Sequence, residues 1–424
     1  MQKKKRDLKP TSLLSKLGPG LITGASDDDP SGIATYSQVG AQFGFGMLWT
    51  ALFSFPLMVA IQEIAARLGR VTGHGIAGNL RRHYSPWVLR IAVSLLLIAN
   101  VLNLGADLGA MGAAVQLLIG GPALLYVVLL GFLSLWAEIV LPYSRYVHIL
   151  KWLTLALFAY VAAAFAIRMP WLAALHATLV PSFTFSRAYI IGFIAVMGTT
   201  ISPYLFFWQA SEEVEEEQRN GARSLRSAPQ TADAELRRIN LDTCIGMGFS
   251  NIITFFIMLT AAATLHTHGI VNIGTAADAA KALEPFAGKF ASLLFTLGIV
   301  GTGLLAVPIL SGSVAYALGE ALQWKVGLEL KPTKAKGFYG ILSISIILGL
   351  LLNFLHIDPI QALFWSAVVN GIIAVPLMAL MMNMGSNKKV MGKFTLPLWL
   401  RIGGWLTTAV MLVAVIGMAA TMGG

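Results

Sequence analysis

The chain has 424 residues, of which 56% are hydrophobic and 12% are charged, and its mean hydropathy is +0.73. Soluble domains hold about 25% charged residues, so this composition excludes a chain that is solvated mainly by water. The net charge of +10 could suggest nucleic acid, but the basic residues lie between apolar runs and not in one tail, which indicates membrane topology and no nucleic-acid partner. The single cysteine, Cys244, excludes internal disulfides and Cys-based metal sites.

Apolar runs of membrane-spanning length recur from one end of the chain to the other, and the loops between them are smaller than a domain. A span needs about 20 mostly apolar residues, and about 11 such segments fit. We therefore expect an all-α polytopic protein with one membrane domain over residues 1–424 and the lipid bilayer as its surroundings. The predicted spans cover residues 14–43, 47–68, 88–118, 122–141, 147–167, 188–210, 239–265, 289–321, 337–355, 359–383 and 398–421.

The orientation follows from where the 30 Lys and Arg residues lie. Cytoplasmic loops retain positive charge during insertion, and most of these residues fall on one side when the N-terminus is placed in the cytoplasm. An odd number of spans then puts the C-terminus outside. The N-terminal basic residues resemble the start of a signal peptide, but no cleavage site of small residues follows, so we expect them in the mature protein.

The first span contains three adjacent carboxylates, Asp27 to Asp29. A charged side chain at mid-bilayer costs about 2.5–3.5 kcal/mol on insertion scales, and three in a row on a regular helix would put at least one toward lipid. The sequence therefore predicts that the helix unwinds between Asp27 and Gly32. Asp29 suits the N-cap of the second half-helix, with Pro30 as its first residue.

The third span carries a polar stripe of Asn100, Asn103 and Asp107, which share one helical face. The two asparagines are typical of hydrogen bonds between helices, although they could also line a pathway. Asp107 is a predicted buried acid, and such residues usually mark a functional pathway.

The sixth span repeats the interruption of the first, with Ser202 as a cap residue directly before Pro203. The spans that follow each break have similar lengths, so we expect two repeats, residues 14–167 and 188–383, and an extra helix at 398–421. Five spans per repeat is an odd number, so the second repeat is inverted in the membrane. In secondary transporters with this plan, the two broken helices meet at the bilayer midplane and form the substrate site. The lone prolines within other spans, Pro56, Pro308 and Pro376, are expected to be kinks.

Several other acids are expected to be solvated. The run Glu212 to Glu217 follows the sixth span, and we expect it to form a solvated helical extension. Glu63, Glu138 and Glu320 lie near span ends, where we expect solvated carboxylates.

The candidate ligands at the two breaks are all oxygen atoms from carboxylates, hydroxyls and freed carbonyls. None of the seven His residues falls in either break, and the nearest thioether, Met197, is expected to point elsewhere. The predicted metal ligands are Asp29, Ser31, Gly32, Thr199, Thr200 and Ser202. Residues expected along the pathway or around these ligands are Asp27, Asp28, Asn103, Asp107, Tyr204, Gln209 and Asn370.

Hard oxygen ligands with a few carboxylates suit Mg²⁺ or Ca²⁺, followed by Mn²⁺. Mg²⁺ loses water reluctantly, so small residues such as Gly32 and Ser202 would leave room for a partly hydrated ion. The predicted role is therefore transport of a divalent cation as substrate, with no cofactor and no obligatory protein partner.

Several motifs together resemble the Nramp family of divalent-metal transporters. They are Gly18-Pro19-Gly20-Leu21 through Asp29-Pro30, the stretch 40–46 (Gly-Ala-Gln-Phe-Gly-Phe-Gly), the stretch 66–73 (Ala-Arg-Leu-Gly-Arg-Val-Thr-Gly) and the Ser-Pro break of the sixth span. The resemblance covers the first ten spans. It implies a LeuT-type fold, with helices one and six broken, in the inner membrane of a prokaryote.

The chain departs from the Nramp pattern at the ligand positions. The family reads Asp-Pro-Gly-Asn in helix one, whereas this chain keeps the acid as Asp29 but has Gly32 in place of the amide. The family reads Met-Pro-His in helix six, where this chain has Ser202 and Tyr204, and Gln209 stands where a second histidine would be.

A further departure concerns the third span, where Asp107 matches a family acid of the proton route but Ala110 replaces the acid three positions later. These changes resemble the Nramp-related magnesium transporters and imply Mg²⁺ transport with weak or absent proton coupling.

Two other functions remain open at this point. A proton-coupled Mn²⁺/Fe²⁺ importer of ordinary Nramp type is favoured by Asp29 and Asp107. An organic-solute symporter on the same fold is disfavoured, because Asp27 to Asp29 would repel a substrate carboxylate. An enzyme is disfavoured because no nucleophile–base pair or His cluster is evident.

Overall fold

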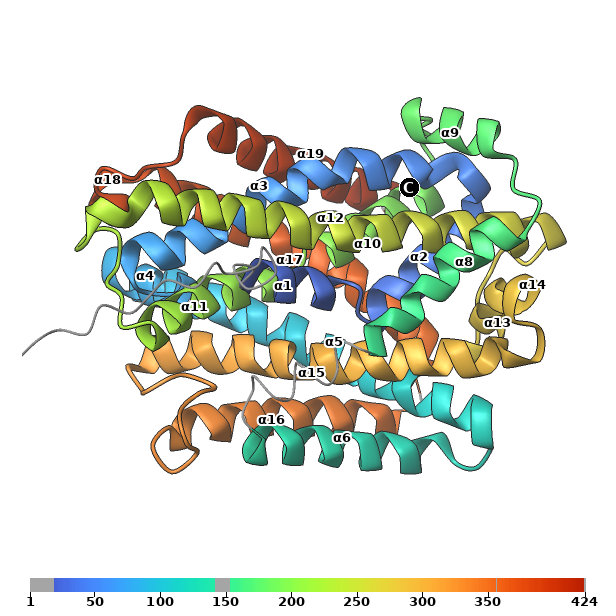
Figure 1. Cartoon of the computed structure of the whole chain (residues 1–424), viewed down its shortest axis with the longest axis horizontal. Helices are drawn as coiled ribbons and strands as arrows, with labels where there is room; N and C mark the ends of the chain where they lie inside the picture. The colour runs from blue at the N-terminus through green and yellow to red at the C-terminus, as the bar shows by residue number, and fades with distance from the viewer. Residues whose placement is uncertain (1–18, 142–152, 356, 423–424) are drawn as a thin grey trace, which may run out of the picture.

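Long helices build the protein, and they run along its longest axis (Figure 1). The computed structural model describes residues 19–141, 153–355 and 357–422, and every regular element in these ranges is helical. The long uninterrupted helices are α3 (Leu48–Thr72), α5 (Pro86–Ile119), α6 (Ala123–Val140), α12 (Ala232–Thr264), α15 (Ala291–Leu322), α16 (Lys336–Leu352), α17 (Pro359–Ser386) and α19 (Leu398–Met422).

Two helix pairs lie in the middle of the molecule and are interrupted where the sequence predicts (Figure 1). The first pair is α1 (Pro19–Asp27) and α2 (Pro30–Phe43), and the second is α10 (Arg187–Thr200) and α11 (Pro203–Arg219). In each pair the second helix begins at a proline directly after a cap residue. The prediction of two broken helices is confirmed, but the first break is shorter than the predicted segment from Asp27 to Gly32. Only Asp28 and Asp29 lie between α1 and α2, because α2 already begins at Pro30.

Shorter helices join the long ones along the chain. They are α4 (Ile76–His83), α8 (Phe158–Ala166), α9 (Trp171–Leu179), α13 (Ala276–Ala280), α14 (Glu284–Ala287) and α18 (Lys388–Met391). Single 3₁₀ turns are η2 (Gly44–Met47), η3 (Leu153–Leu157), η4 (Pro229–Thr231), η5 (His266–His268), η6 (Lys281–Leu283), η7 (Gly288–Phe290) and η8 (Asn353–Leu355).

The number of spans agrees with the prediction. Among the described residues, nine helical stretches are long and apolar enough to cross a membrane, or ten if the bent pair Leu155–Ala166 and Trp171–Leu179 is one span. One of these stretches, Pro30–Thr72, contains both α2 and α3, which the turn at η2 separates. Parts of the predicted spans 14–43 and 147–167 lie outside the described residues.

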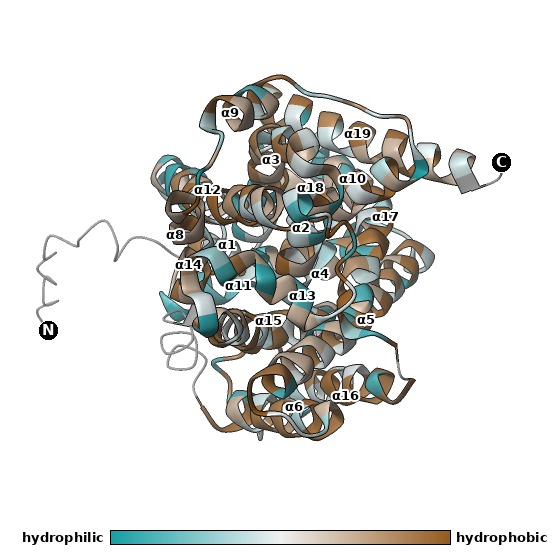
Figure 2. Ribbon diagram, turned by 90° about the vertical axis from the view of Figure 1, so that its right-hand side faces the viewer, coloured by the Kyte–Doolittle hydropathy of each residue, from teal (hydrophilic) through white to brown (hydrophobic). Residues whose placement is uncertain are grey.

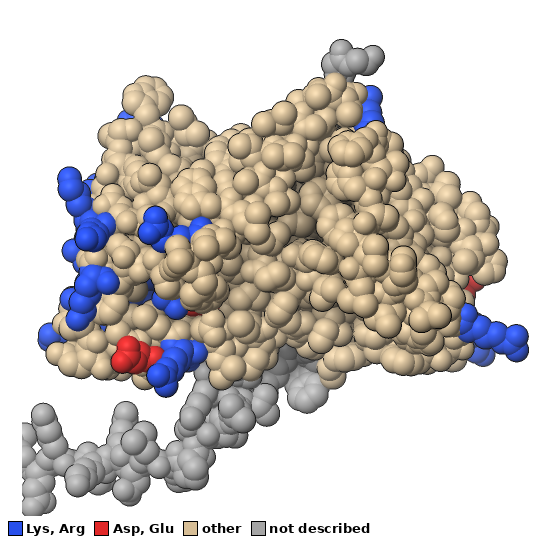
Figure 3. Space-filling view, turned by 90° about the horizontal axis from the view of Figure 1, so that it is seen from above, with Lys and Arg blue, Asp and Glu red and all other residues tan. Residues whose placement is uncertain are grey.

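The outer surface is apolar where lipid would cover it. Figure 2 shows α6 and α16 at one edge of the molecule, coloured mainly as hydrophobic, and large side chains such as Phe132, Trp136 and Ile344 are exposed on them. Figure 3 shows Lys and Arg at the two ends of the molecule, more of them at the end of α4 and α18, with an uncharged belt between. This distribution is that of a membrane-spanning protein.

The half-helix that leads into each break packs its backbone directly on a neighbouring helix. A Cβ atom built on Gly24 of α1 would lie 2.1 Å from the carbonyl oxygen of Gly246 in α12. One built on Gly198 of α10 would lie 2.1 Å from the carbonyl oxygen of Ala367 in α17. Small residues permit such approaches where lipid gives no hydrophobic force between helices. These contacts fix the positions of the two breaks.

The prolines predicted to be kinks all lie inside continuous helices. Pro56 is within α3, Pro308 within α15 and Pro376 within α17. None of them divides its helix in two, in contrast to Pro30 and Pro203.

Candidate metal site at the two helix breaks

Asp29 is the central residue of the first break. Its backbone is extended, and its Oδ1 accepts a hydrogen bond from the Gly32 amide at 2.8 Å, so it caps α2 as predicted. Its Oδ2 accepts from Asn103 Nδ2 of α5 and from the Tyr204 hydroxyl of α11, each at 3.1 Å. Three elements therefore orient one buried carboxylate, which is 1% exposed.

The second break exposes the last carbonyls of α10. Ser202 precedes Pro203, but, unlike Asp29, its side chain makes no capping hydrogen bond to α11, so the prediction of a capping serine is wrong. Its hydroxyl instead donates to the carbonyls of Gly198 at 2.7 Å and Thr199 at 2.9 Å. The Thr200 hydroxyl donates to the Val196 carbonyl at 2.7 Å and lies 3.1 Å from the Tyr36 hydroxyl of α2. Carbonyls at the end of a helix carry partial negative charge, which suits a cation.

The two breaks meet in space. A Cβ built on Gly32 would lie 3.4 Å from Thr199 Oγ1, 3.3 Å from the Asp27 carbonyl oxygen and 3.2 Å from the Tyr36 ring. The Ser31 hydroxyl is fully buried and has no hydrogen-bond partner among the residues that the structure describes. The structure thus brings together Asp29, Ser31, Gly32, Thr199, Thr200 and Ser202, the set that the sequence predicts.

Asp107 lies beside this group. It is fully buried in α5, close to Asp29 and to the Ser31 amide, and no side chain among the described residues donates a hydrogen bond to its carboxylate. Asn103, one turn earlier, binds Asp29 with its amide nitrogen and accepts from Ser366 of α17 at 2.8 Å with its oxygen. Of the predicted stripe, Asn100 instead binds the Leu310 carbonyl and Ser313 of α15, as expected for a contact between helices.

Asp27 and Asp28 contact a different helix from Asp29. Both are fully buried, and Ser250 of α12 donates to Asp27 Oδ2 at 2.5 Å and to Asp28 Oδ1 at 3.2 Å. Their other oxygens have no hydrogen-bond partner within the described part of the chain. The three adjacent carboxylates therefore diverge, as the unwound segment allows.

The remaining predicted pathway residues differ in their surroundings. Asn370 lies one turn after Ser366 on α17 and is 1% exposed, and in residues 19–141, 153–355 and 357–422 neither of its amide atoms has a hydrogen-bond partner. Gln209 lies two turns along α11 and accepts from the Thr23 hydroxyl of α1. It therefore connects two half-helices and does not contact Asp29.

Three residues that the sequence reasoning missed complete the arrangement: Tyr36, Ser250 and Ser366. A lone serine in an apolar span gives little signal, because most such hydroxyls bond to their own helix. Tyr36 could have been found, since it follows Gly32 by one helical turn and so faces the same side of α2.

Four acids surround the breaks without a basic partner; we call Asp27, Asp28, Asp29 and Asp107 the break cluster. Within the described ranges, none of them lies within 4.0 Å of a Lys, Arg or His nitrogen. The same ranges hold no group of three or more His, Cys, Asp or Glu that could bind a metal by themselves. A cation here would also depend on hydroxyl, amide and carbonyl oxygens.

A second group of acids corrects the prediction for the run Glu212 to Glu217. This run is helical, but Glu212, Glu213 and Glu217 are buried and not solvated. Arg238 Nη2 lies 2.5 Å from Glu213, and Arg70 Nη1 lies 2.7 Å from Glu217.

The same two arginines bind further acids. Glu235 lies 3.1 Å from Arg70 Nε and 3.2 Å from Arg238 Nε, and Asp242 lies 3.9 Å from Arg238. Asp242 also accepts from the backbone amides of Gly20 and Leu21 at 2.7 and 3.1 Å, so it caps α1. We call Arg70, Glu213, Glu217, Glu235, Arg238 and Asp242 the arginine cluster.

Two of the acids near span ends are also less exposed than predicted. Glu63 is fully buried and binds Arg67 at 2.6 Å and Asn240 at 2.7 Å. Glu138 is 6% exposed and accepts from Ser311 of α15 at 3.2 Å. Glu320 is partly exposed, and it accepts from the amides of Gly75 and Gly78. Helix partners distant in sequence cover these carboxylates.

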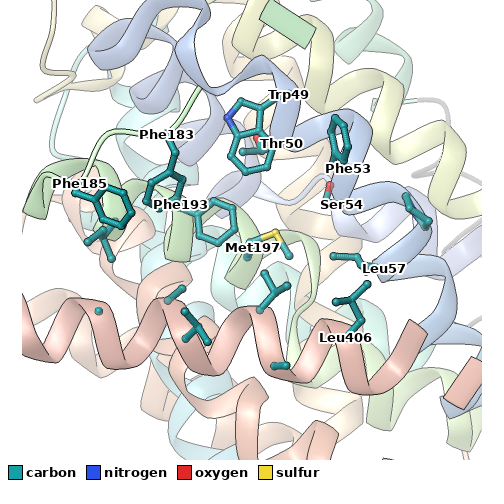
Figure 4. A pocket seen from close by; sticks show the side chains of 17 residues that line it. Trp49, Thr50, Phe53, Ser54, Leu57, Phe183, Phe185, Phe193, Met197 and Leu406 are labelled. Atoms are coloured by element: carbon teal, nitrogen blue, oxygen red, sulfur yellow. The ribbon is translucent and has the colours of Figure 1, made fainter. Parts of the chain in front are cut away.

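A cavity of about 700 Å³ between α3, α10 and α19 is apolar and separate from the break cluster. Figure 4 shows Trp49, Phe53, Phe193 and Met197 around it. The Met197 thioether therefore lines this cavity and does not face the oxygen ligands, as the sequence predicts.

Comparison with known proteins identifies the family of the chain. Residues 20–421 match the family described as natural resistance-associated macrophage protein-like, or Nramp. A protein named divalent metal cation transporter MntH from Klebsiella pneumoniae (strain 342) is 27% identical over 406 residues, covering 94% of this chain and 92% of the relative. The MntH of Pectobacterium carotovorum is 28% identical over 400 residues, covering 92% and 90%.

Solved structures support the fold. A manganese transporter of Eremococcus coleocola superposes with a TM-score of 0.75 at 17% identity, covering 97% of this chain and 89% of the other. MhsT in complex with L-phenylalanine gives a TM-score of 0.67 at 11% identity, covering 98% of this chain and 100% of MhsT.

These superpositions confirm the LeuT-like fold with two broken helices. The family match extends over nearly the whole described chain. The chain belongs to the Nramp family and is a divalent metal cation transporter, not an enzyme.

Proposed function

We propose that the transported substrate is a hard divalent cation, Mg²⁺ first and Mn²⁺ second, moved as a partly hydrated ion by alternating access with weak or no proton coupling. The break cluster is the observation that carries this proposal. Its four acids are buried, and no basic side chain compensates them among the described residues. Uncompensated charge in a membrane interior is unfavourable, so a bound cation is a natural partner.

We assign the ligands to both breaks. Asp29 supplies the main full charge, and the carbonyls of Thr199 and Thr200 supply the partial charge of a helix end. The hydroxyls of Ser31, Thr199, Thr200 and Ser202 are additional oxygen donors, and Gly32 keeps the side of α2 that faces Thr199 free of a side chain. Asn103 and Tyr204 hold the Asp29 carboxylate in place.

The preference for Mg²⁺ rests on the type of ligand. Ser202 stands where the Nramp pattern has a thioether, and Met197, the nearest other thioether in the sequence, lines the apolar cavity. Soft ligands favour transition metals, whereas an all-oxygen site favours Mg²⁺, Ca²⁺ and Mn²⁺.

A proton-coupled importer of Mn²⁺ or Fe²⁺ is the second candidate. The names of the similar proteins favour it more directly than Mg²⁺, because the Eremococcus coleocola structure is titled a manganese transporter. Asp29 and Asp107, both buried at the first break, also suit this candidate. The two candidates differ in ion preference and in proton movement.

Uptake into proteoliposomes separates them. The purified protein would be reconstituted, and entry of Mg²⁺, Mn²⁺ and Ca²⁺ would be compared while a trapped dye reports internal pH. We expect Mg²⁺ entry without matching acidification, and no entry with Asp29→Ala. Entry of Mn²⁺ alone, with stoichiometric acidification, would establish the second candidate and overturn the first.

We also propose one transport domain with repeats at 14–167 and 188–383, an extra helix at 398–421, and a cytoplasmic N-terminus in a prokaryotic inner membrane. The gathering of Lys and Arg at the end of α4 and α18 supports this orientation (Figure 3). A Cys244→Ser background with Lys334→Cys tests it. An impermeant thiol reagent should label position 334 only in opened cells, and labelling of intact cells would reverse the orientation.

A further inference from the structure

A polar pocket of about 330 Å³ lies at the end of the molecule that holds α4, far along the chain from the residues of the breaks. Its lining includes two arginines, two histidines and two serines, and no Asp or Glu is among the lining residues. These residues are His74, Arg82, His83, Ser224, Arg226 and Ser227. The volume is at the lower end of the about 300–1,000 Å³ typical of small-molecule pockets.

The pocket is built from two segments that backbone hydrogen bonds hold together. The amides of Leu225 and Arg226 donate to the carbonyls of Arg70 and Val71, both at 3.2 Å. On the opposite wall, the Asn79 side chain donates to the carbonyls of His74 and Gly75 at 2.8 and 3.0 Å, which fixes the turn before α4. The cationic side chains therefore project from a fixed backbone.

The positive charge of the pocket is not neutralised within it. Arg82 has no carboxylate within 4.0 Å in the described ranges, and its electrostatic partner Glu320 is already bound to two backbone amides. Arg226 donates to the Val390 carbonyl at 2.9 Å and likewise forms no ion pair in these ranges. The nearby acid Glu217 is bound by Arg70 at 2.7 Å.

Burial and the nearby positive charge both lower the pKa of the two histidines. Burial and then the charges of Arg82 and His83 lower the pKa of His74. Burial, Arg226 and Arg82 lower the pKa of His83. Neutral imidazoles still present ring N–H donors, and the serine hydroxyls, 3.2 Å apart, present two more groups that can donate.

The location suits the headgroup layer of a membrane. Arg82 and His83 directly precede Pro86, where α5 begins. Trp87 is 70% exposed and carries Arg90 over its ring at 5.4 Å, and exposed Trp residues are typical of the membrane–water interface. Basic pockets at this depth bind anionic lipid headgroups.

We propose that this pocket binds a phosphate group, with Arg82 and Arg226 as its charged contacts and the two serines and two histidines as hydrogen-bond donors. The phosphate belongs either to an anionic lipid headgroup or to a soluble phosphate-bearing ligand. Arginine binds phosphate with short, charge-assisted hydrogen bonds, and a divalent cation is the wrong charge for this site.

Lipid binding is tested by titrating the detergent-purified full chain with phosphatidylglycerol or phosphatidylcholine and counting bound lipid by native mass spectrometry. Arg82→Gln should weaken phosphatidylglycerol binding about fivefold, and Arg82→Lys should restore most of it. Arg226→Gln should act like Arg82→Gln. Lys334→Gln is the matched control, because Lys334 is an exposed cation outside the pocket.

Soluble ligands are tested by the thermal shift that inorganic phosphate causes in lipid-free protein at constant ionic strength. Selective phosphatidylglycerol binding that falls in both arginine variants supports a lipid headgroup. Stabilisation by inorganic phosphate that Arg82→Gln removes, without lipid selectivity, supports a soluble ligand. Equal lipid affinity in Arg82→Gln and Lys334→Gln, with no phosphate stabilisation in the wild-type protein, would overturn the proposal.

Discussion

Two groups of buried acids lie in one membrane protein, and they are compensated in opposite ways. In the arginine cluster, the buried Glu213 and Glu217 and the partly exposed Glu235 each lie within 3.2 Å of an arginine nitrogen. In the break cluster, Asp29 receives hydrogen bonds from an asparagine, a tyrosine and a backbone amide, all of them neutral.

The difference indicates that the arginine cluster stabilises the fold, whereas the break cluster serves transport. Removing one partner of a buried ion pair leaves an unpaired charge and is strongly destabilising, so the arginine cluster is a structural joint between α3, α11 and α12. The break cluster has no such partner among the described residues, and its charge must be met by an ion or by protons. We expect substitutions in the two groups to affect different properties.

The largest effect is expected at Asp29. Asp29→Asn should abolish Mg²⁺ binding or weaken it strongly. The loss should exceed that caused by removing an outer-shell partner, which weakens metal binding about 10–100-fold. Stability should change little, because Asn also caps helices and no ion pair is broken. Calorimetric titration and a melting curve measure the two properties. Retained binding in a monodisperse variant would contradict the assignment of Asp29.

Arg238→Gln should produce the reverse pattern. It leaves Glu213 buried without its charge partner. Breaking a fully buried pair costs about 3–5 kcal/mol of stability. We expect a smaller loss of about 2–4 kcal/mol, because Arg238 is 20% exposed. Ion affinity of the folded protein should stay within a few-fold.

Arg219→Gln is the control for Arg238→Gln. Arg219 pairs with Glu329, and the two side chains are 50% and 39% exposed, respectively. Loss of this exposed ion pair should cost at most about 1 kcal/mol of stability. Thermal unfolding in detergent compares the two variants. Equal melting temperatures would show that the arginine cluster is not a structural joint.

The pair Gly32→Asn with Ser202→Met tests selectivity at the breaks. A Cβ at position 32 would lie 3.2–3.4 Å from Tyr36, Asp27 and Thr199, so the substitution fills space as well as adding an amide. The thioether adds a soft ligand, and we expect the Mg²⁺-to-Mn²⁺ affinity ratio to fall about tenfold. The ratio is measured by competition binding. An equal loss for both ions would mean that the two positions are structural.

The smallest effect is expected for Ser250→Ala, which removes the donor to Asp27 and Asp28. Loss of such hydrogen bonds typically costs about 1 kcal/mol of stability. Ion affinity should change less than in Asp29→Asn, because these two acids contact α12. A larger loss of affinity than in Asp29→Asn would move the binding site toward α12.

The fold was largely predictable because its signals are local. A cap residue followed by proline occurs at Asp29-Pro30 and Ser202-Pro203, and both helices break there. The span limits also agree within a few residues at most ends, because an apolar run is read directly from the sequence.

Partners distant in sequence account for what could not be predicted. Glu217 is buried because Arg70, 147 residues away, reaches it, and Asp27 contacts Ser250, 223 residues away. No local pattern marks which helix supplies the partner. The sequence shows where each acid lies. Which basic side chain neutralises it depends on how the helices pack.

The most direct test of the break cluster is the position of a bound cation. Crystals grown with Mn²⁺, which serves as a probe for an oxygen site, would be measured at a wavelength where manganese scatters anomalously. We expect a peak between Asp29 and the carbonyls of Thr199 and Thr200, and its loss in Asp29→Asn. A peak at the arginine cluster, or a peak between the breaks that persists in Asp29→Asn, would contradict the central claim.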